Sequence, residues 1–152
     1  MVVEFIKNRF FQSDNVKEID KNRDDTINII ALLIEASAID GRIDDDEKLK
    51  IIDMVSQYFK VNREEADTLY KEARIKQEES TSFHSFTSKI HQTYSYKEKI
   101  NILEMLWEVV LVNKDLHDFE SSLMRRICGL LHLKDTDNGI VKKRAMKKLN
   151  LS

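Results

Sequence analysis

A short acidic segment holds the densest group of chemically useful side chains in this sequence. Its five carboxylates are Asp40, Asp44, Asp45, Asp46 and Glu47. Carboxylate oxygens are the hard ligands that Ca²⁺ and Mg²⁺ prefer, and a divalent cation relieves the repulsion between neighbouring carboxylates. The spacing is not that of an EF-hand, because Arg42 occupies the third position, where that loop needs an oxygen ligand. We therefore predict a Ca²⁺ or Mg²⁺ site with Asp40, Asp44 and Glu47 as its ligands.

The same segment also has a purely structural interpretation. Asp44 precedes an amphipathic stretch and has Glu47 three residues later, which is the spacing of a capping box at a helix start. Asp45 and Asp46 then lie in the first helical turn, beside the positive end of the helix dipole. Gly41 suits the left-handed turn that ends the preceding helix. Metal binding and helix capping both remain open at this point.

Two further carboxylates, Glu35 and Glu108, stand in segments that are apolar on nearly all sides. A carboxylate in such surroundings must be protonated, paired with a cation, or bonded to N–H groups, since burying it without a partner is costly. We expect both to be buried structural carboxylates that accept hydrogen bonds from backbone N–H groups at neighbouring helix starts. The alternative is a catalytic carboxylate pair. The sequence shows no nucleophile or second polar group near them, so we predict no catalytic residues.

Histidine and cysteine do not form a metal-ligand pattern. His84 and His91 are seven positions apart, and no histidine pair has the i, i+4 spacing of a zinc site. The single cysteine, Cys128, lies on an apolar stripe, which favours a buried structural thiol over a nucleophile.

Basic side chains are concentrated near the C-terminus of the sequence. They are Lys142, Lys143, Arg144, Lys147 and Lys148. Such a helix can bind an acidic membrane or nucleic acid, but a basic face near a helix C-terminus is also favourable on its own. We expect a solvated face, with Val141, Ala145 and Leu149 pointing inward.

The elements that must position these residues are helices. The sequence has no Pro and only three Gly, so it lacks the turn residues of a many-stranded fold. Capping boxes or their looser forms at Asp44, Asn62 and Ser95 each precede apolar residues at helical spacing. The fold class we predict is all-α, a single-domain bundle of about eight helices. The expected ranges are 2–11, 25–39, 44–59, 63–78, 83–92, 96–112, 118–132 and 137–149. Residues 1–23 are expected to be an N-terminal helix and polar linker, and 24–150 the helical domain.

The sequence predicts an internal duplication that relates the two halves of this domain. Glu35 and Glu108 are 73 positions apart, and at this offset the apolar pattern of 31–59 agrees with that of 104–132. We therefore predict two pseudo-symmetric helical hairpins, each with a central helix, a tight turn and an amphipathic helix.

Composition limits the function classes. A net charge of −2 and a sequence pI near 6.1 give no basic field for nucleic acid, so none is expected as a partner. The most apolar run, 27–39, is shorter than the roughly 20 residues a bilayer needs, so no membrane span is expected. One cysteine excludes an intramolecular disulfide framework and suits a reducing compartment. Cytoplasmic localisation is the expectation.

The acidic segment resembles a repeat of the TerB-like (tellurite resistance protein TerB-like) family. Asp40-Gly41-Arg42-Ile43, followed by Glu47, matches the D-G-x-I-x-x-x-E part of that repeat, and Leu106 to Glu120 is similar to the second repeat. The second copy has Asn113-Lys114 where the family usually has Asp-Gly. Its Asp115, Asp118 and Glu120 are therefore weaker metal candidates. The resemblance covers about Asp24 to Leu149.

This resemblance implies a non-enzymatic binding or scaffold domain with an unidentified protein partner. The family name links such a domain to tellurite resistance and stress. In this interpretation the acidic turn binds Ca²⁺ or Mg²⁺. One alternative is a protein-interaction module without metal, since the family is similar in fold to part of a DnaJ-like co-chaperone. Another is a small enzyme that uses a buried Glu.

Overall fold

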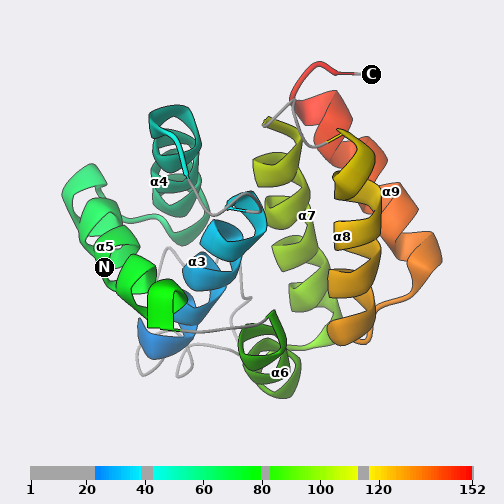
Figure 1. The fold of residues 1–152 in the computed structure, drawn as a ribbon, viewed down its shortest axis with the longest axis horizontal. Coiled ribbons are helices and arrows are strands. Elements are labelled where there is room, and N and C mark those ends of the chain that lie inside the picture. The colour runs from blue at the N-terminus through cyan, green and yellow to red at the C-terminus, as the bar shows by residue number, and fades with distance from the viewer. Residues whose placement is uncertain (1–22, 39–42, 80–82, 113–116, 152) are drawn as a thin grey trace.

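A computed structural model describes residues 23–38, 43–79, 83–112 and 117–151, with the side chains of 117–120 left out. All regular structure in this part of the chain is helical (Figure 1). The seven helices are α3 (Arg23–Ser37), α4 (Asp45–Phe59), α5 (Arg63–Glu79), α6 (Phe83–Thr93), α7 (Tyr96–Val112), α8 (His117–Leu130) and α9 (Asp135–Lys148). They confirm the all-α class. The expected helix 2–11 and its linker lie outside the described residues, so the count of eight and the division at residue 23 stay predictions.

The helix starts follow the predicted capping residues. The Asp44 side chain accepts from the Glu47 backbone N–H at 2.8 Å, and the Glu47 side chain accepts from the Asp44 N–H at 3.0 Å. Ser95 and Glu98 form the same reciprocal pair at the start of α7. These bonds satisfy N–H groups that the first helical turn leaves without helical partners.

Three helix ends have a left-handed residue that is not glycine. Lys60, His132 and Asn150 have φ values of 55°, 62° and 60°. After α8, Leu133 N–H donates to the Cys128 carbonyl and His132 N–H to the Gly129 carbonyl, which is the Schellman pattern. The left-handed His132 is why α8 ends at Leu130 and not at the predicted residue 132.

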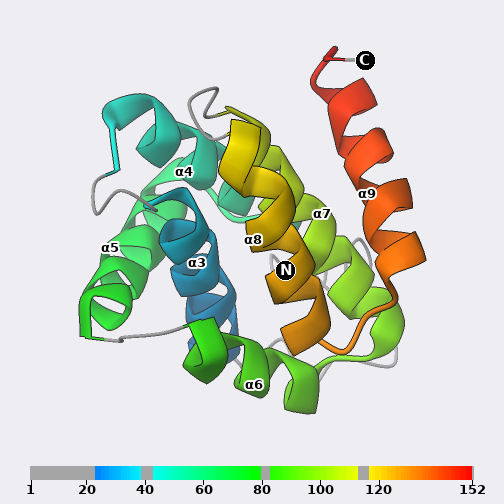
Figure 2. The same ribbon diagram turned by 45° about the vertical axis from the view of Figure 1, so that its right-hand side comes forward.

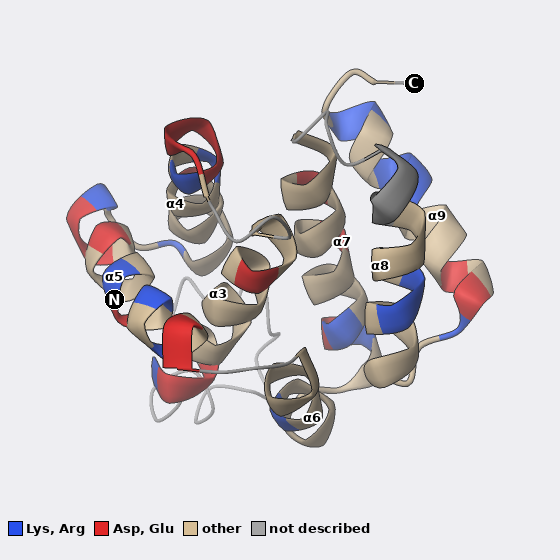
Figure 3. Cartoon of the chain, in the orientation of Figure 1, with Lys and Arg blue, Asp and Glu red and all other residues tan. Residues whose placement is uncertain are grey.

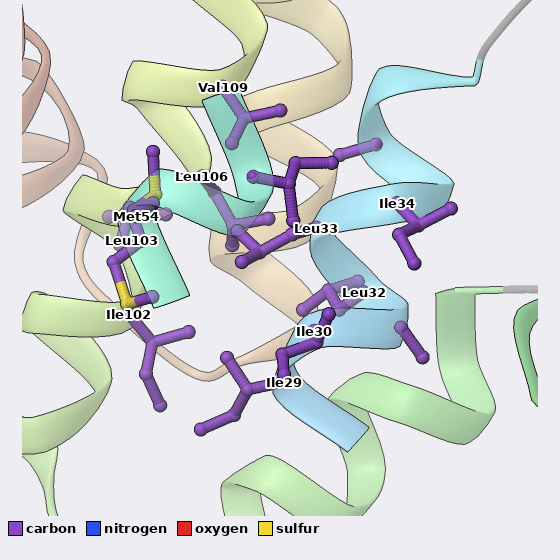
Figure 4. Packing of buried hydrophobic residues seen from close by; sticks show 14 of the residues in the cluster. Ile29, Ile30, Leu32, Leu33, Ile34, Met54, Ile102, Leu103, Leu106 and Val109 are labelled. Atoms are coloured by element: carbon purple, nitrogen blue, oxygen red, sulfur yellow. The ribbon is translucent and has the colours of Figure 1, made fainter. Parts of the chain in front are cut away.

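The core lies around α3 and α7, the two helices expected to be central. Nearly every apolar side chain of both is buried, and α3 contacts α4, α5, α6 and α7. Side chains of the two helices meet in the space between them (Figure 4). Their apolar character on most sides is what allows them to be covered from several directions. No helix among the described residues is long and apolar enough to cross a bilayer.

Helix α9 lies beside α7 and α8, on the opposite side of the molecule from α5 (Figures 1 and 2). Val141 and Ala145 are buried, as expected. Arg144 donates to Glu104 at 2.8 Å, and Lys142 Nζ lies 5.1 Å from the centre of the Trp107 ring. The expectation of a solvated face is confirmed for Lys143, Arg144, Lys147 and Lys148, which are all exposed. Part of this face also has acidic and aromatic partners on α7.

Burial agrees with the 73-residue offset at several positions. Leu33 and Leu106 are both fully buried, as are Ile51 and Met124. The rotational relationship of the two hairpins is not established by burial alone and stays a prediction.

Candidate functional site

The structure describes the helical side of the acidic turn, from Ile43 onward. Asp45 and Asp46 are exposed in the first turn of α4, where acidic residues gather in Figure 3. Asp44 is exposed as well, whereas Glu47 is only 5% exposed. The capping box brings Asp44 and Glu47 together, and each commits one carboxylate oxygen to a backbone N–H. The helix-capping part of the structural interpretation is thus confirmed, whereas Gly41 lies outside the described residues. The capping box brings two of the expected metal ligands into one helical turn.

Helix α5 packs against α4, whose first turn carries Glu47. Burial, and next in the same direction the negative charge of Glu47, raise the pKa of Tyr70, while Arg74 opposes the shift. Lys48 Nζ lies 5.7 Å from the centre of the Tyr70 ring. Glu47 therefore lies near an aromatic ring and two basic side chains.

The other expected ligands cannot be placed to the same detail. Asp40 and Asp115 lie outside the described residues. Asp118 and Glu120 belong to the first turn of α8, but their side chains are not described. Among the side chains that are described, no group of three His, Cys, Asp or Glu could hold a metal ion. The Asp44 and Glu47 carboxylates supply oxygen donors, the type that Ca²⁺ and Mg²⁺ prefer, and the metal site itself stays a prediction.

Glu108 is buried, with 3% of its surface exposed, but its partners differ from those expected. The Tyr58 hydroxyl donates to Glu108 Oε2 at 2.9 Å, and Lys148 Nζ donates to the same oxygen at 3.1 Å. We expected backbone N–H groups at a helix start, and this expectation is wrong among the described residues. A cation from α9 and a phenol from α4 reach the middle of α7 and satisfy the carboxylate there.

Glu35 has a different environment. It is half-buried, and its Oε1 accepts from Gln77 Nε2 of α5 at 2.9 Å. Gln77 in turn accepts from Arg74 at 3.1 Å. The described partner is again a side chain and not a backbone N–H, because α5 lies alongside α3 at this level.

Tyr58 and Lys148 were not predicted from the sequence as partners of Glu108. The two lie 50 and 40 positions from Glu108 in the chain, so no local spacing connects them. The one available signal was the run of basic residues on the last turns of α9, opposite a helix that contains Glu104 and Glu108.

Cys128 has the structural role that the sequence predicts. Its thiol is buried and lies 3.5 Å and 3.6 Å from the carbonyl oxygens of Leu133 and Lys134. Burial, supported by the nearby Asp135 and Asp137, raises the pKa of the thiol to about 11. Since the thiolate is the reactive form, this cysteine is a poor nucleophile near neutral pH.

Together these features define an all-helical domain in which an acidic turn lies between a central helix and an amphipathic helix. Residues 26–143 match the family model described as Tellurite resistance protein TerB. The match spans most of the chain, which therefore belongs to the TerB family. No curated protein and no solved structure matches the sequence.

Proposed function

We propose that this chain is a non-enzymatic binding domain that takes a divalent cation, Ca²⁺ or Mg²⁺, at the turn between α3 and α4. Asp40, Asp44 and Glu47 are the proposed ligands. The observation that carries the proposal is the capping box, which holds the Asp44 and Glu47 carboxylates together at one helix end within the family-matched segment. The carboxylates of Asp45 and Asp46 add to the negative potential there.

Binding at this turn is expected to be weak. The capping bonds already use one oxygen of Asp44 and one of Glu47, and the positive end of the α4 dipole opposes a cation. A Ca²⁺ ion takes six to eight oxygen ligands, so water must complete the shell. These features favour a site that responds to high cation concentrations over one that retains its ion permanently.

The proposal of a non-enzymatic role is supported by the state of the central carboxylates. Glu108 accepts hydrogen bonds from Tyr58 and Lys148, and Glu35 accepts one from Gln77. In both cases the carboxylate is hydrogen-bonded to side chains of neighbouring helices, which suits a structural role. A role in tellurite or stress resistance, suggested by the family name, and an unidentified protein partner belong to the same proposal. A cytoplasmic location is part of it too, supported by a lone cysteine that is held as a buried thiol.

The test separates metal binding from helix capping. Asp44→Ser keeps a good N-cap acceptor and Glu47→Gln keeps a capping-box acceptor, but each removes a negative charge. Thermal unfolding is measured with and without millimolar Ca²⁺ or Mg²⁺ at matched ionic strength. A ligand of the folded state raises the unfolding midpoint of the wild type, and both variants should lose that rise.

Glu64→Gln is the matched control, because Glu64 is an exposed carboxylate in the first turn of α5. It should keep the full cation response. Equal midpoints with and without cation in the wild type would reject the metal site and favour the interaction module without metal. A response lost equally in Glu64→Gln would show general charge screening.

A further inference from the structure

A second cluster of titratable groups lies where α6, α7 and the end of α8 meet, away from the acidic turn. The imidazole rings of His91 and His132 are stacked, with centroids 3.9 Å apart and planes 18° from parallel. Lys99 Nζ lies 2.8 Å from His91 Nδ1 and donates to the Leu131 carbonyl at 2.8 Å. Three chain segments are therefore joined by one lysine and two histidines.

Lys99 determines the protonation state that this geometry requires. An ammonium group has donors only, so His91 Nδ1 must accept and His91 must be neutral, with its proton on Nε2. Lys99 is only 4% exposed, and burial lowers its pKa from the ordinary lysine value. Its bond to Leu131 places its charge at the C-terminal end of α8, where the helix dipole favours a cation.

His132 takes part through its backbone conformation. It is the left-handed residue that ends α8, and this conformation turns its ring onto His91. Residues other than glycine rarely adopt this left-handed conformation, although histidine is among the types enriched there. The stacking of the two rings is thus coupled to the end of α8.

We propose that the cluster of His91, Lys99 and His132 is a pH-sensitive junction, closed at neutral pH and opened in mild acid by protonation of His91. A proton on Nδ1 removes the acceptor for Lys99 and puts a second cation against a buried ammonium group. The last turn of α6 then separates from α7 and from the end of α8.

Most groups around His91 favour its neutral form, and two features favour the protonated form: the Leu131 carbonyl and the C-terminal end of α6. Desolvation lowers the pKa of His91 most, followed by the positive charge of Lys99 and by His132, while the Leu131 carbonyl opposes the shift. The C-terminal end of α6 also favours a cation. The hydrogen bond that Asn28 Nδ2 of α3 donates to the Phe86 carbonyl of α6, at 3.0 Å, is between neutral groups.

The other charged contact on α6 is remote from the junction. Arg126 of α8 lies over the ring of Phe83, at the first residue of α6. No carboxylate is among the described partners of His91, so only the Leu131 carbonyl and the C-terminal end of α6 favour its positive charge there.

The sign of the pH dependence follows from the lowered pKa. The junction contributes its full stabilisation when the pH is above about 6.5, the pKa of histidine in the unfolded chain. This stabilisation is lost as the pH falls through the lower pKa that His91 has in the folded protein. The test compares thermal unfolding of the wild type and His91→Gln at pH 7.5 and pH 5.5, at equal ionic strength. The Gln amide oxygen still accepts from Lys99 but does not titrate in this range.

We expect the midpoint of the wild type to fall further on acidification than that of His91→Gln, by about 2–4 °C, the scale on which single interactions act in a domain of this size. His84→Gln is the matched control, since His84 is exposed on the same helix, and it should behave as the wild type does. Equal falls in the wild type and His91→Gln would overturn the proposal.

A measurement on the wild type alone decides the matter if His91→Gln does not fold. An NMR titration of the His91 ring should give a pKa below 6.5, with amide exchange in the last turn of α6 rising as that ring protonates, after correction for the intrinsic pH effect. A His91 pKa at or above 6.5, or exchange in α6 that stays unchanged, contradicts the junction.

Discussion

Lys148 Nζ lies 3.1 Å from Glu108 Oε2, so the last turn of α9 is tied to the middle of the central helix α7. The Tyr58 hydroxyl of α4 completes the contact, since it donates to Glu108 and accepts from Lys148 at 2.7 Å. The carboxylate is buried while the lysine is half-exposed. Three helices thus meet at one carboxylate, and this contact fixes α9 against the core.

Glu108→Ala should destabilise the fold by roughly 1–3 kcal/mol, because Tyr58 would lose its acceptor and Lys148 its nearest counter-charge. Glu35→Ala should cost less, since Glu35 is half-buried and bonds only Gln77 among the described residues. The two free energies of unfolding are measured by urea denaturation. A larger loss in Glu35→Ala would contradict the assigned environments of the two carboxylates.

Alkaline pH should weaken the same contact. Burial is the main reason that the pKa of Tyr58 is raised to about 12, and Glu108 raises it further against the opposing effect of Lys148. Burial alone would lower the pKa of Lys148, but hydrogen bonds to Tyr58 and Glu108 raise it. The pKa values of Tyr58 and Lys148 are both higher in the folded protein than in the unfolded chain. This stabilisation is therefore present below about pH 10 and is lost as the pH rises further.

Tyr58→Phe removes the phenol and should make urea midpoints between pH 8 and pH 11 decline less steeply than in the wild type. Tyr70→Phe is the comparison, because the pKa of Tyr70 is also raised, by its own burial, without contact to Lys148. If Tyr58→Phe declines as steeply as the wild type, Tyr58 does not titrate as described.

Lys60→Gly should stabilise the protein by about 1 kcal/mol, because Lys60 ends α4 in the left-handed conformation with a φ of 55°. Gln57→Gly, at an exposed position inside α4, should do the opposite by a similar amount. Both are read from urea unfolding curves. Destabilisation by Lys60→Gly would mean that the lysine side chain contributes more than its backbone conformation costs.

Local signals in the sequence were sufficient for most of the fold. Capping residues such as Asp44 and Ser95 gave the helix starts, and the apolar character of 27–39 and 102–112 indicated which helices are central. The left-handed ends at Lys60 and His132 were not predictable in this way, because the chain does not use glycine there. Their conformation is stabilised by carbonyl bonds of the preceding turn.

The functional groups were harder to predict than the helices. The capping box showed that Asp44 and Glu47 lie together, since both belong to one helical turn. The partners of Glu108 and the stacking of His91 on His132 depend on how separate helices pack, and sequence spacing contains no information on that. The residues that meet in these two clusters are 40 to 90 positions apart in the sequence.

Titration calorimetry with Ca²⁺ and with Mg²⁺ tests the central claim, cation binding at the acidic turn, most directly. The wild type and Glu64→Gln should give the same weak, saturable binding of one ion, and the double variant Asp44→Ser/Glu47→Gln should give none while keeping its helical circular dichroism. Heats in the wild type that equal those of dilution, or binding that survives unchanged in the folded double variant, would contradict the account.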